Sequence, residues 1–393
     1  MAKVVLIRCE TYEQVKVEEA ITRGLKLIGG ADKFAKKGER ILLKPNLLVG
    51  DPPEKCVTTH PAVFKAVGSI FKKTGATIVF GDSPAINTPL SAARRSKILQ
   101  AAEELHIELV DFEKGKEIFF EEGVQNRKFL IANGVLESDA LISLPKLKTH
   151  GLEKLTGSVK NQFGCIPGFV KGEYHVKLPD ANDFARMLVD LNNYLKPRLY
   201  IMDGIYGMEG NGPRGGTPRQ MNLLLMSEDP IALDATLCRL LDVEPEFVPT
   251  VKFGYQTGAG TYLTDEIELL GDEFQQFKNC DFNIDREQIR PFIGQGILRF
   301  LNNRLVSKPY IVKEKCIKCG QCVTMCPTNP KSVNWQLGNK KKVPRYDYGS
   351  CIRCYCCQEL CPEKAIKLKV PFSRRVLTQV RNLSEPIIRR FRK

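Results

Sequence analysis

Two cysteine runs near the C-terminus constrain this chain more than any other feature of its sequence. Residues 316–327 and 351–362 share the pattern C-x2-C-x2-C-x3-C-P, with an offset of 35 residues. Three thiolates at this spacing can hold three corners of a cubane iron–sulfur cluster. A disulfide framework is the other use of dense cysteines. The N-terminus, MAKVVLIRCE, lacks the pattern of a signal peptide, so metal is the favoured interpretation.

Over residues 308–370 the repeat resembles the ferredoxins of the bacterial dicluster type. The resemblance implies two [4Fe–4S] clusters, with the fourth cysteine of each run completing the cluster held by the other run. The implied ligands are Cys316, Cys319, Cys322 and Cys361 for one cluster, and Cys351, Cys354, Cys357 and Cys326 for the other. Two structural zinc sites are the alternative, although the four-cysteine run with proline is not zinc-like spacing.

Cys356 is a fifth cysteine in the second run and falls outside both sets. The matching position of the first run is Gln321. A packed or exposed thiol is the simplest reading of this residue. A redox-sensitive thiol or an alternative cluster ligand is the functional one.

The excess positive charge lies in the last quarter of the chain. The net charge is +14, and residues 301–393 hold 21 Lys/Arg against five Asp/Glu. A nucleic-acid surface is one explanation but is not favoured, because the same region carries the cysteine runs. The charge that bound clusters would not offset could face an acidic redox partner or an anionic membrane surface. The Lys340–Lys342 run is most simply a solvated loop, and a docking surface for an acidic partner is the alternative. Residues 371–393 have helical apolar spacing among arginines, and could contact a membrane surface or pack on the main domain.

Residues 1–300 alternate between strand and helix patterns. Strands are expected at 3–9, 40–48, 76–84, 139–150, 198–207 and 221–230, with helices at 16–28, 60–73, 91–105, 181–195 and 230–241. This alternation predicts an α/β domain with a mainly parallel sheet and flanking helices, followed by a small α+β ferredoxin-like domain. A hairpin pattern at 117–131 would make the sheet mixed. No run of about 18 apolar residues exists, so we expect a cytoplasmic protein without a transmembrane helix.

Polar motifs stand where the apolar strands stop, which predicts one shared cleft at the carboxyl ends of the strands. The predicted binding residues are Lys44, Asn46, Ser83, Lys146, Lys148, Asn161, Asp203, Glu209 and Asn211. The predicted catalytic residues are His150, Lys160 and Asp82. Converging lysines suit a small anionic substrate or cofactor, and His150 or Asp82 would move protons. Ordinary turn chemistry is the alternative for each motif, and a hydrogen-bonded structural histidine is the alternative for His150.

Two segments add detail to this cleft. TGSVKN, at 156–161, resembles a tight turn entering a helix whose free N–H groups would favour an anion. MEGNGPRGG, at 208–216, holds four glycines and is expected to form a mobile lid. No dinucleotide or Walker motif is present, so neither NAD nor ATP is expected from motifs.

Several motifs, in order, resemble the domain-of-unknown-function 362 family over about residues 1–250. They are ILLKPNLL, GDSPA, LPKLKTH with TGSVKNQFG, and DGIYGMEGNGP with SEDPIALDA. The resemblance implies that these motifs belong to one domain that accompanies iron–sulfur electron transfer. A fainter resemblance is to the lactate racemase family, through His150 and Lys160 ten residues apart, although TGSVK lacks that family's double glycine. It implies a related fold and a ligand cleft rather than racemase activity.

These features predict a ferredoxin-coupled oxidoreductase that acts on a small anion in the α/β cleft. The alternative is an electron-transfer module that docks another redox protein without chemistry of its own. A nucleic-acid-linked protein is a third hypothesis, which binding that weakens steeply with salt would support.

Overall fold

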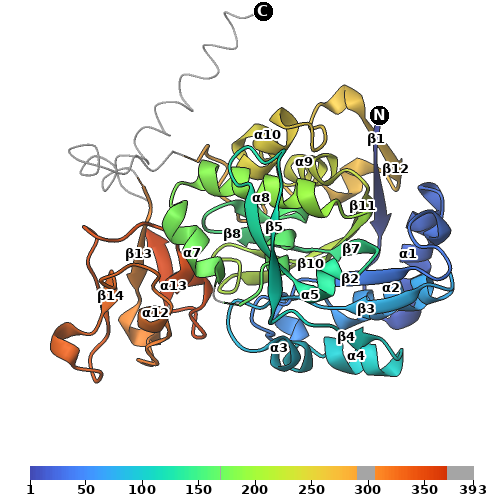
Figure 1. The fold of residues 1–393 in the computed structure, drawn as a ribbon. Coiled ribbons are helices and arrows are strands. Elements are labelled where there is room, and N and C mark those ends of the chain that lie inside the picture. The colour runs from blue at the N-terminus through green and yellow to red at the C-terminus, as the bar shows by residue number, and fades with distance from the viewer. Residues whose placement is uncertain (169, 290–305, 370–393) are drawn as a thin grey trace, which may run out of the picture.

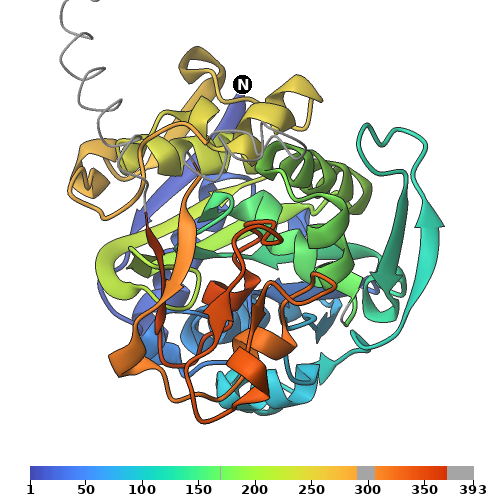
Figure 2. The same ribbon diagram turned by 90° about the vertical axis from the view of Figure 1, so that its left-hand side faces the viewer.

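The computed structural model describes residues 1–168, 170–289 and 306–369, which form a large α/β domain and a small domain beside it (Figure 1). In Figure 2 the small domain, coloured orange to red, lies in front of the large one. The predicted tail at 371–393 lies outside the described residues, so its membrane contact stays a prediction. Among the described residues, no helix is both long and apolar enough to cross a membrane.

A ten-stranded sheet forms the centre of the large domain. Its strand order is β12-β1-β11-β10-β7-β2-β3-β4, and β8 and β9 extend from β10. The strands are β1 (Ala2–Arg8), β2 (Arg40–Pro45), β3 (Thr77–Phe80), β4 (Glu108–Leu109), β7 (Ala140–Leu144), β8 (Lys146–His150), β9 (Lys154–Thr156), β10 (Leu199–Glu209), β11 (Thr217–Ser227) and β12 (Ile267–Gly271). Most neighbours are parallel, as the alternation of strands and helices predicts.

The sheet is mixed, but not for the reason expected from the sequence. The predicted hairpin is present as β5 (Gly115–Phe119) and β6 (Lys128–Ala132), which form a separate two-stranded sheet. The antiparallel pairs of the main sheet are β1 with β11, β10 with β11, and β8 with β9. β10 and β11 pair directly because only the short segment 210–216 joins them.

Helices cover both faces of the sheet (Figure 1). They are α1 (Gln14–Leu27), α2 (Pro61–Lys72), α3 (Pro89–Arg95), α4 (Ile98–Glu104), α5 (Asn133–Leu136), α6 (Ser158–Asn161), α7 (Val170–Lys177), α8 (Ala181–Leu195), α9 (Pro230–Leu240) and α10 (Pro249–Gln256). The single helix expected at 91–105 is two helices, α3 and α4, separated at Lys97, whose φ of 61° lies in the left-handed region.

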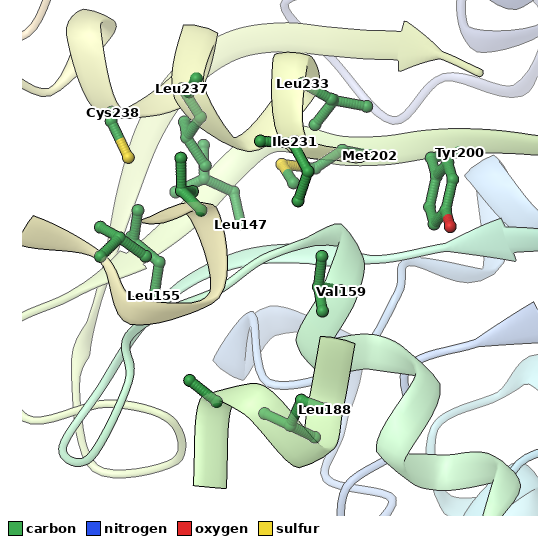
Figure 3. Packing of buried hydrophobic residues seen from close by; sticks show 14 of the residues in the cluster. Leu147, Leu155, Val159, Leu188, Tyr200, Met202, Ile231, Leu233, Leu237 and Cys238 are labelled. Carbon is green, nitrogen blue, oxygen red and sulfur yellow. The ribbon is translucent and has the colours of Figure 1, made fainter. Parts of the chain in front are cut away.

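Strand alternation divides the core into two layers. In β1, Val4 and Leu6 pack on one face of the sheet, with α8, α9 and α10, whereas Val5 and Ile7 pack on the other, with α1, α2 and α4. Figure 3 shows the first layer, in which Leu147 and Met202 of the sheet meet Ile231 and Leu237 of α9. This rigid support fixes where the strand ends lie.

The small domain consists of two antiparallel two-stranded sheets and two short helices. The sheets pair β13 (Lys308–Ile311) with β16 (Ile366–Lys369), and β14 (Val333–Asn334) with β15 (Arg345–Tyr346). The helices are α12 (Gln321–Thr324) and α13 (Cys356–Glu359), one within each cysteine run. This is the small α+β arrangement predicted for the ferredoxin-like part.

The glycine-rich loop at 208–216 joins the two domains, contrary to the predicted mobile lid. Gln358 of α13 donates to the backbone oxygens of Asn211 and Gly212, each at 3.0 Å. Arg214 binds Asp51 through two nitrogens, at 2.6 and 3.0 Å, and donates to the Leu360 oxygen at 2.9 Å. A Cβ at Gly212 would lie 2.2 Å from the Thr149 oxygen, so the glycine permits a close approach of backbones rather than motion.

Candidate functional site

A cavity of about 420 Å³ lies between the two domains. Eight of the twelve predicted cleft residues line it: Lys44, Asn46, Asp82, Ser83, Lys148, His150, Lys160 and Asn161. They come from the ends of β2 and β3, from β8 and from α6, so the strand-end rule correctly places them together. The small domain supplies Cys326, Cys356 and Glu359.

Lys44 and Asp82 form a buried ion pair in the floor of the cavity. Lys44 Nζ lies 2.8 Å from Asp82 Oδ1, and the two side chains are 1% and 4% exposed. Asp82 also accepts from Leu47 N at 2.7 Å. A Cβ at Gly164 would lie 1.8 Å from Asp82 Oδ1, so only glycine fits there. Asp82 is held on both oxygens, which suits positioning of Lys44 better than the proton transfer predicted for it.

Two further lysines are buried in hydrogen bonds. Lys148 uses two of its three N–H donors, and Lys171 uses all three. Lys148 Nζ donates to Asn46 Oδ1 and to Val57 O, each at 2.7 Å. Burial, with a smaller effect of Lys160, lowers the pKa of Lys148 to about 7. Lys171 of α7 contacts both Ser83 oxygens and donates to Pro84 O at 3.1 Å. Burial lowers its pKa to about 7 as well.

Lys160 is the cavity lysine whose ammonium group is available. Among the described residues no hydrogen-bond acceptor or carboxylate is paired with its Nζ. The Nζ lies 5.0 Å from the ring centre of Phe163 and 5.8 Å from that of Phe184. Burial lowers its pKa, and the nearby carboxyl of Glu359 opposes that effect. In its protonated form, an amine with free donors in a partly apolar cavity can bind an anion.

His150 links the two domains. Its Nδ1 accepts from the backbone N–H groups of Leu152 and Glu153, each at 3.1 Å. The ring proton is therefore on Nε2, which lies 3.0 Å from Glu359 Oε1. Burial lowers the pKa of His150. Burial would raise the pKa of Glu359, but His150 and Lys160 outweigh it and hold that pKa at about 2. Nδ1 of His150 accepts two hydrogen bonds and Nε2 lies beside a carboxylate. These contacts favour a structural histidine over a catalytic one.

Lys171 and His175 are cavity residues that the sequence analysis missed. Both lie on α7, four residues apart, with Tyr174 buried beside them. The His175 ring stacks on Phe184 at 4.4 Å, and its buried Nδ1 has no hydrogen-bond partner among the described residues. The i, i+4 spacing of a lysine and a histidine was the available signal.

The start of α6 does not offer the predicted anion site. Asp234 of α9 accepts from the Ser158 N–H at 2.8 and 3.0 Å. The protein's own carboxylate therefore occupies the free N–H groups of this turn.

Four predicted residues lie elsewhere. Lys146 and Asp203 form a separate buried pair at 2.8 Å, joined by the Tyr12 hydroxyl. Glu209 accepts from Asn283 N, and Asn211 belongs to the domain interface. The structure does not bring these four to the cavity.

The cysteines stand around two separate cavities in the small domain. The outer set, Cys316, Cys319, Cys322 and Cys361, lines one of them. The inner set, Cys326, Cys351, Cys354 and Cys357, lines the other. Among the described residues, no three His, Cys, Asp or Glu converge closely enough to hold a single metal ion. Each set surrounds its own cavity, the arrangement that four-thiolate ligation of a cubane requires.

Cys356 belongs to neither set, as the register of the repeat predicts. It is 8% exposed and lines the interdomain cavity together with Cys326 of the inner set. The α13 helix thus carries a thiol of the inner set, Cys357, and two cavity residues, Cys356 and Glu359. The interdomain cavity therefore reaches the wall of the inner set.

Comparisons with known proteins match two separate parts of the chain. Residues 315–365 match the family described as 4Fe-4S dicluster domain, which makes the chain an iron–sulfur protein of the electron-transfer class. An uncharacterized ferredoxin of Methanocaldococcus jannaschii is 40% identical over 58 residues, 15% of this chain and 73% of the ferredoxin.

The large domain has relatives of its own. The thylakoid-associated protein sll1697 of Synechocystis sp. is 36% identical over 247 residues, which are 63% of this chain and 76% of the relative. Among solved structures, the lactate racemase apoprotein of Thermoanaerobacterium thermosaccharolyticum matches with a TM-score of 0.41 and 13% identity, over 60% of this chain and 56% of that one. Residues 41–239 match the family described as domain of unknown function DUF362, and the chain belongs to that family.

Proposed function

We propose that this protein is an oxidoreductase that exchanges electrons between two [4Fe–4S] clusters and a small organic anion bound in the interdomain cavity. The observation that carries the proposal is the extent of one cavity, which contains both the available ammonium group of Lys160 and the thiol-bearing residue Cys326. A lysine suited to binding an anion and a thiol of the inner set thereby line the same cavity.

The two sides of the cavity differ in chemistry. The α/β side presents four lysines, Lys44, Lys148, Lys160 and Lys171. The small-domain side presents Met325, Pro327 and Leu360 with the two thiols. Its two charged residues are already engaged, since Lys331 donates to backbone oxygens and Glu359 lies beside His150. A ligand with an anionic group at one end and an apolar, reducible body at the other fits this division. Its charged end would bind Lys160, and its body would lie against Cys326.

The inner and outer sets are the residues that would hold the clusters. Bound clusters supply single electrons at low potential. A two-electron reduction of the ligand would then require one electron from each cluster and two protons. Lys148 has a pKa of about 7 and a donor not used by its partners, so it can deliver one of the two protons near neutral pH, and the second would come from water.

The test is substrate-dependent oxidation of the reduced protein. Anaerobically purified protein is reduced with dithionite, freed of excess reductant and mixed with a panel of small carboxylates and phosphate esters that contain a conjugated double bond. We expect one class to oxidise the clusters, measured by their visible absorption and by EPR. The Lys160→Met variant should retain its iron and react at least tenfold more slowly, because it lacks the anchoring charge.

A matched variant separates charge from folding. Lys114 is an exposed lysine of the same domain and does not line the cavity, so the Lys114→Met variant should react at the wild-type rate. Reoxidation by protein electron carriers alone, with none of the small molecules active, would instead identify an electron-transfer module.

A further inference from the structure

The two cysteine sets have different surroundings. In the outer set, Cys319 is exposed, Cys316 and Cys322 are half-buried, and Cys361 is buried. In the inner set, Cys351 is half-buried and the other three cysteines are buried. The inner set adjoins the interdomain cavity, whereas the outer set opens toward solvent. Electron exchange with another protein is therefore accessible at the outer set.

A group of exposed lysines surrounds the outer set. Lys313, Lys315 and Lys318 are exposed, and Ile317 among them is 62% exposed. Lys340–Lys342 are also exposed and precede Pro344, which lines the cavity of the outer set. We name these six lysines with Ile317 the basic patch. None of the six ammonium groups is paired with a carboxylate within the described residues.

Charge in the small domain is predominantly positive. Residues 306–369 contain 13 Lys/Arg and four Asp/Glu, and one of the four, Glu359, faces the interdomain cavity. Glu314, between Lys313 and Lys315, and Glu363, at the cavity of the outer set, reduce the positive charge of the basic patch without reversing it. Unpaired lysines around an accessible redox site accelerate encounter with a negatively charged partner and disfavour a positive one. The exposed Ile317, which lines the cavity of the outer set, adds an apolar contact from which a docked partner would exclude water.

We infer that the basic patch docks an acidic one-electron carrier protein of the flavodoxin or ferredoxin type, which delivers electrons at the outer set. One electron would pass from the reduced carrier to the cluster held by the outer set, leaving the carrier oxidised by one electron. Docking is independent of the small-anion chemistry, and only the use of the electron rests on the proposed function.

The experiment measures electron transfer and binding with flavodoxin, an acidic carrier. Stopped-flow mixing of flavodoxin hydroquinone with the oxidised holoprotein, without small anions, gives a second-order rate constant. Calorimetry with oxidised flavodoxin gives the affinity. We expect the Lys313→Glu/Lys315→Glu/Lys318→Glu variant to lose at least tenfold in both at low salt. The wild-type rate should fall as salt screens the charges.

The matched control is Lys26→Glu/Lys37→Glu/Lys116→Glu, which changes the net charge equally at exposed positions of the α/β domain. It should keep most of the wild-type rate. An equal loss in both variants, or a rate insensitive to salt, would overturn the inference. Binding of the wild type and of the patch variant to DNA and to anionic vesicles is measured as well. If the patch variant loses that binding but reacts with flavodoxin at the wild-type rate, the inference is also overturned.

Iron content and reduction by dithionite verify that each variant is loaded. Should the first variant lose iron, Lys340→Glu/Lys341→Glu/Lys342→Glu repeats the test outside the cysteine runs. Failure of flavodoxin docking leaves oxidation by small anions intact, so the two proposals fail separately.

Discussion

At the scale of single residues, Lys148 and Lys171 make the cavity sensitive to pH. Burial lowers the pKa of each to about 7, so both are cationic below that pH and lose their charge above it. Anion affinity should therefore be highest below pH 7 and fall by roughly tenfold between pH 6 and 8. Calorimetry with cinnamate, which stays ionised over this range, measures the dependence. A flat profile would contradict the assigned charges, and Lys148→Met/Lys171→Met should flatten it.

Cys356 tests the register of the cysteine repeat. Its thiol faces the interdomain cavity, whereas the thiol of its neighbour Cys357 is among those of the inner set. We expect Cys356→Ser to keep the full iron and sulfide content of the wild type and Cys357→Ser to lose a large part of it. Iron and sulfide analysis of anaerobically purified protein decides this. Equal losses in both variants would mean that the ligand assignment of the second run is wrong.

At the scale of elements, strand periodicity explains how much of the site could be predicted. Lys146, Lys148 and His150 alternate with Leu147 and Thr149 along β8, so all three face the same side of the sheet. The sequence alone therefore predicts that the side chains of Lys146, Lys148 and His150 lie on one side of the sheet. It could not tell that Lys146 lies beside Asp203 at 2.8 Å while Lys148 lines the cavity, since that depends on the bulge between β8 and β10.

The residues missed by sequence reasoning depend on contacts between distant elements. Asp234 reaches the start of α6 from α9, and Glu359 reaches His150 from the other domain. No local pattern encodes either contact. The glycine-rich loop was expected to be mobile from composition alone, whereas Gly212 is required by a close approach to Thr149. A glycine permits either a close approach to another segment or an unusual turn of the backbone. Which of the two applies depends on the segment that packs against it.

At the scale of the whole molecule, the cavity exists only while the two domains stay together. Arg214 is central to this interface because its guanidinium holds Asp51 of the α/β domain and the Leu360 oxygen of the small domain. Burial would raise the pKa of Asp51, but the hydrogen bonds and charge of Arg214 lower it, so the pair is ionic. Removing one partner of a buried ion pair leaves the other charge without compensation.

Arg214→Ala should therefore weaken the interface by about 3–5 kcal/mol. We expect faster hydrogen exchange in α13 and in residues 208–216, with iron content unchanged because no thiol of either set is altered. Oxidation of the reduced clusters by small anions should slow, since Lys160 and Cys326 would no longer line the same cavity. Arg219→Ala is the matched control, because its pair with Asp281 is 34% and 75% exposed and contributes about 0–1 kcal/mol. Hydrogen exchange of α13 that is equal in the two variants would show that Arg214 does not hold the domains together.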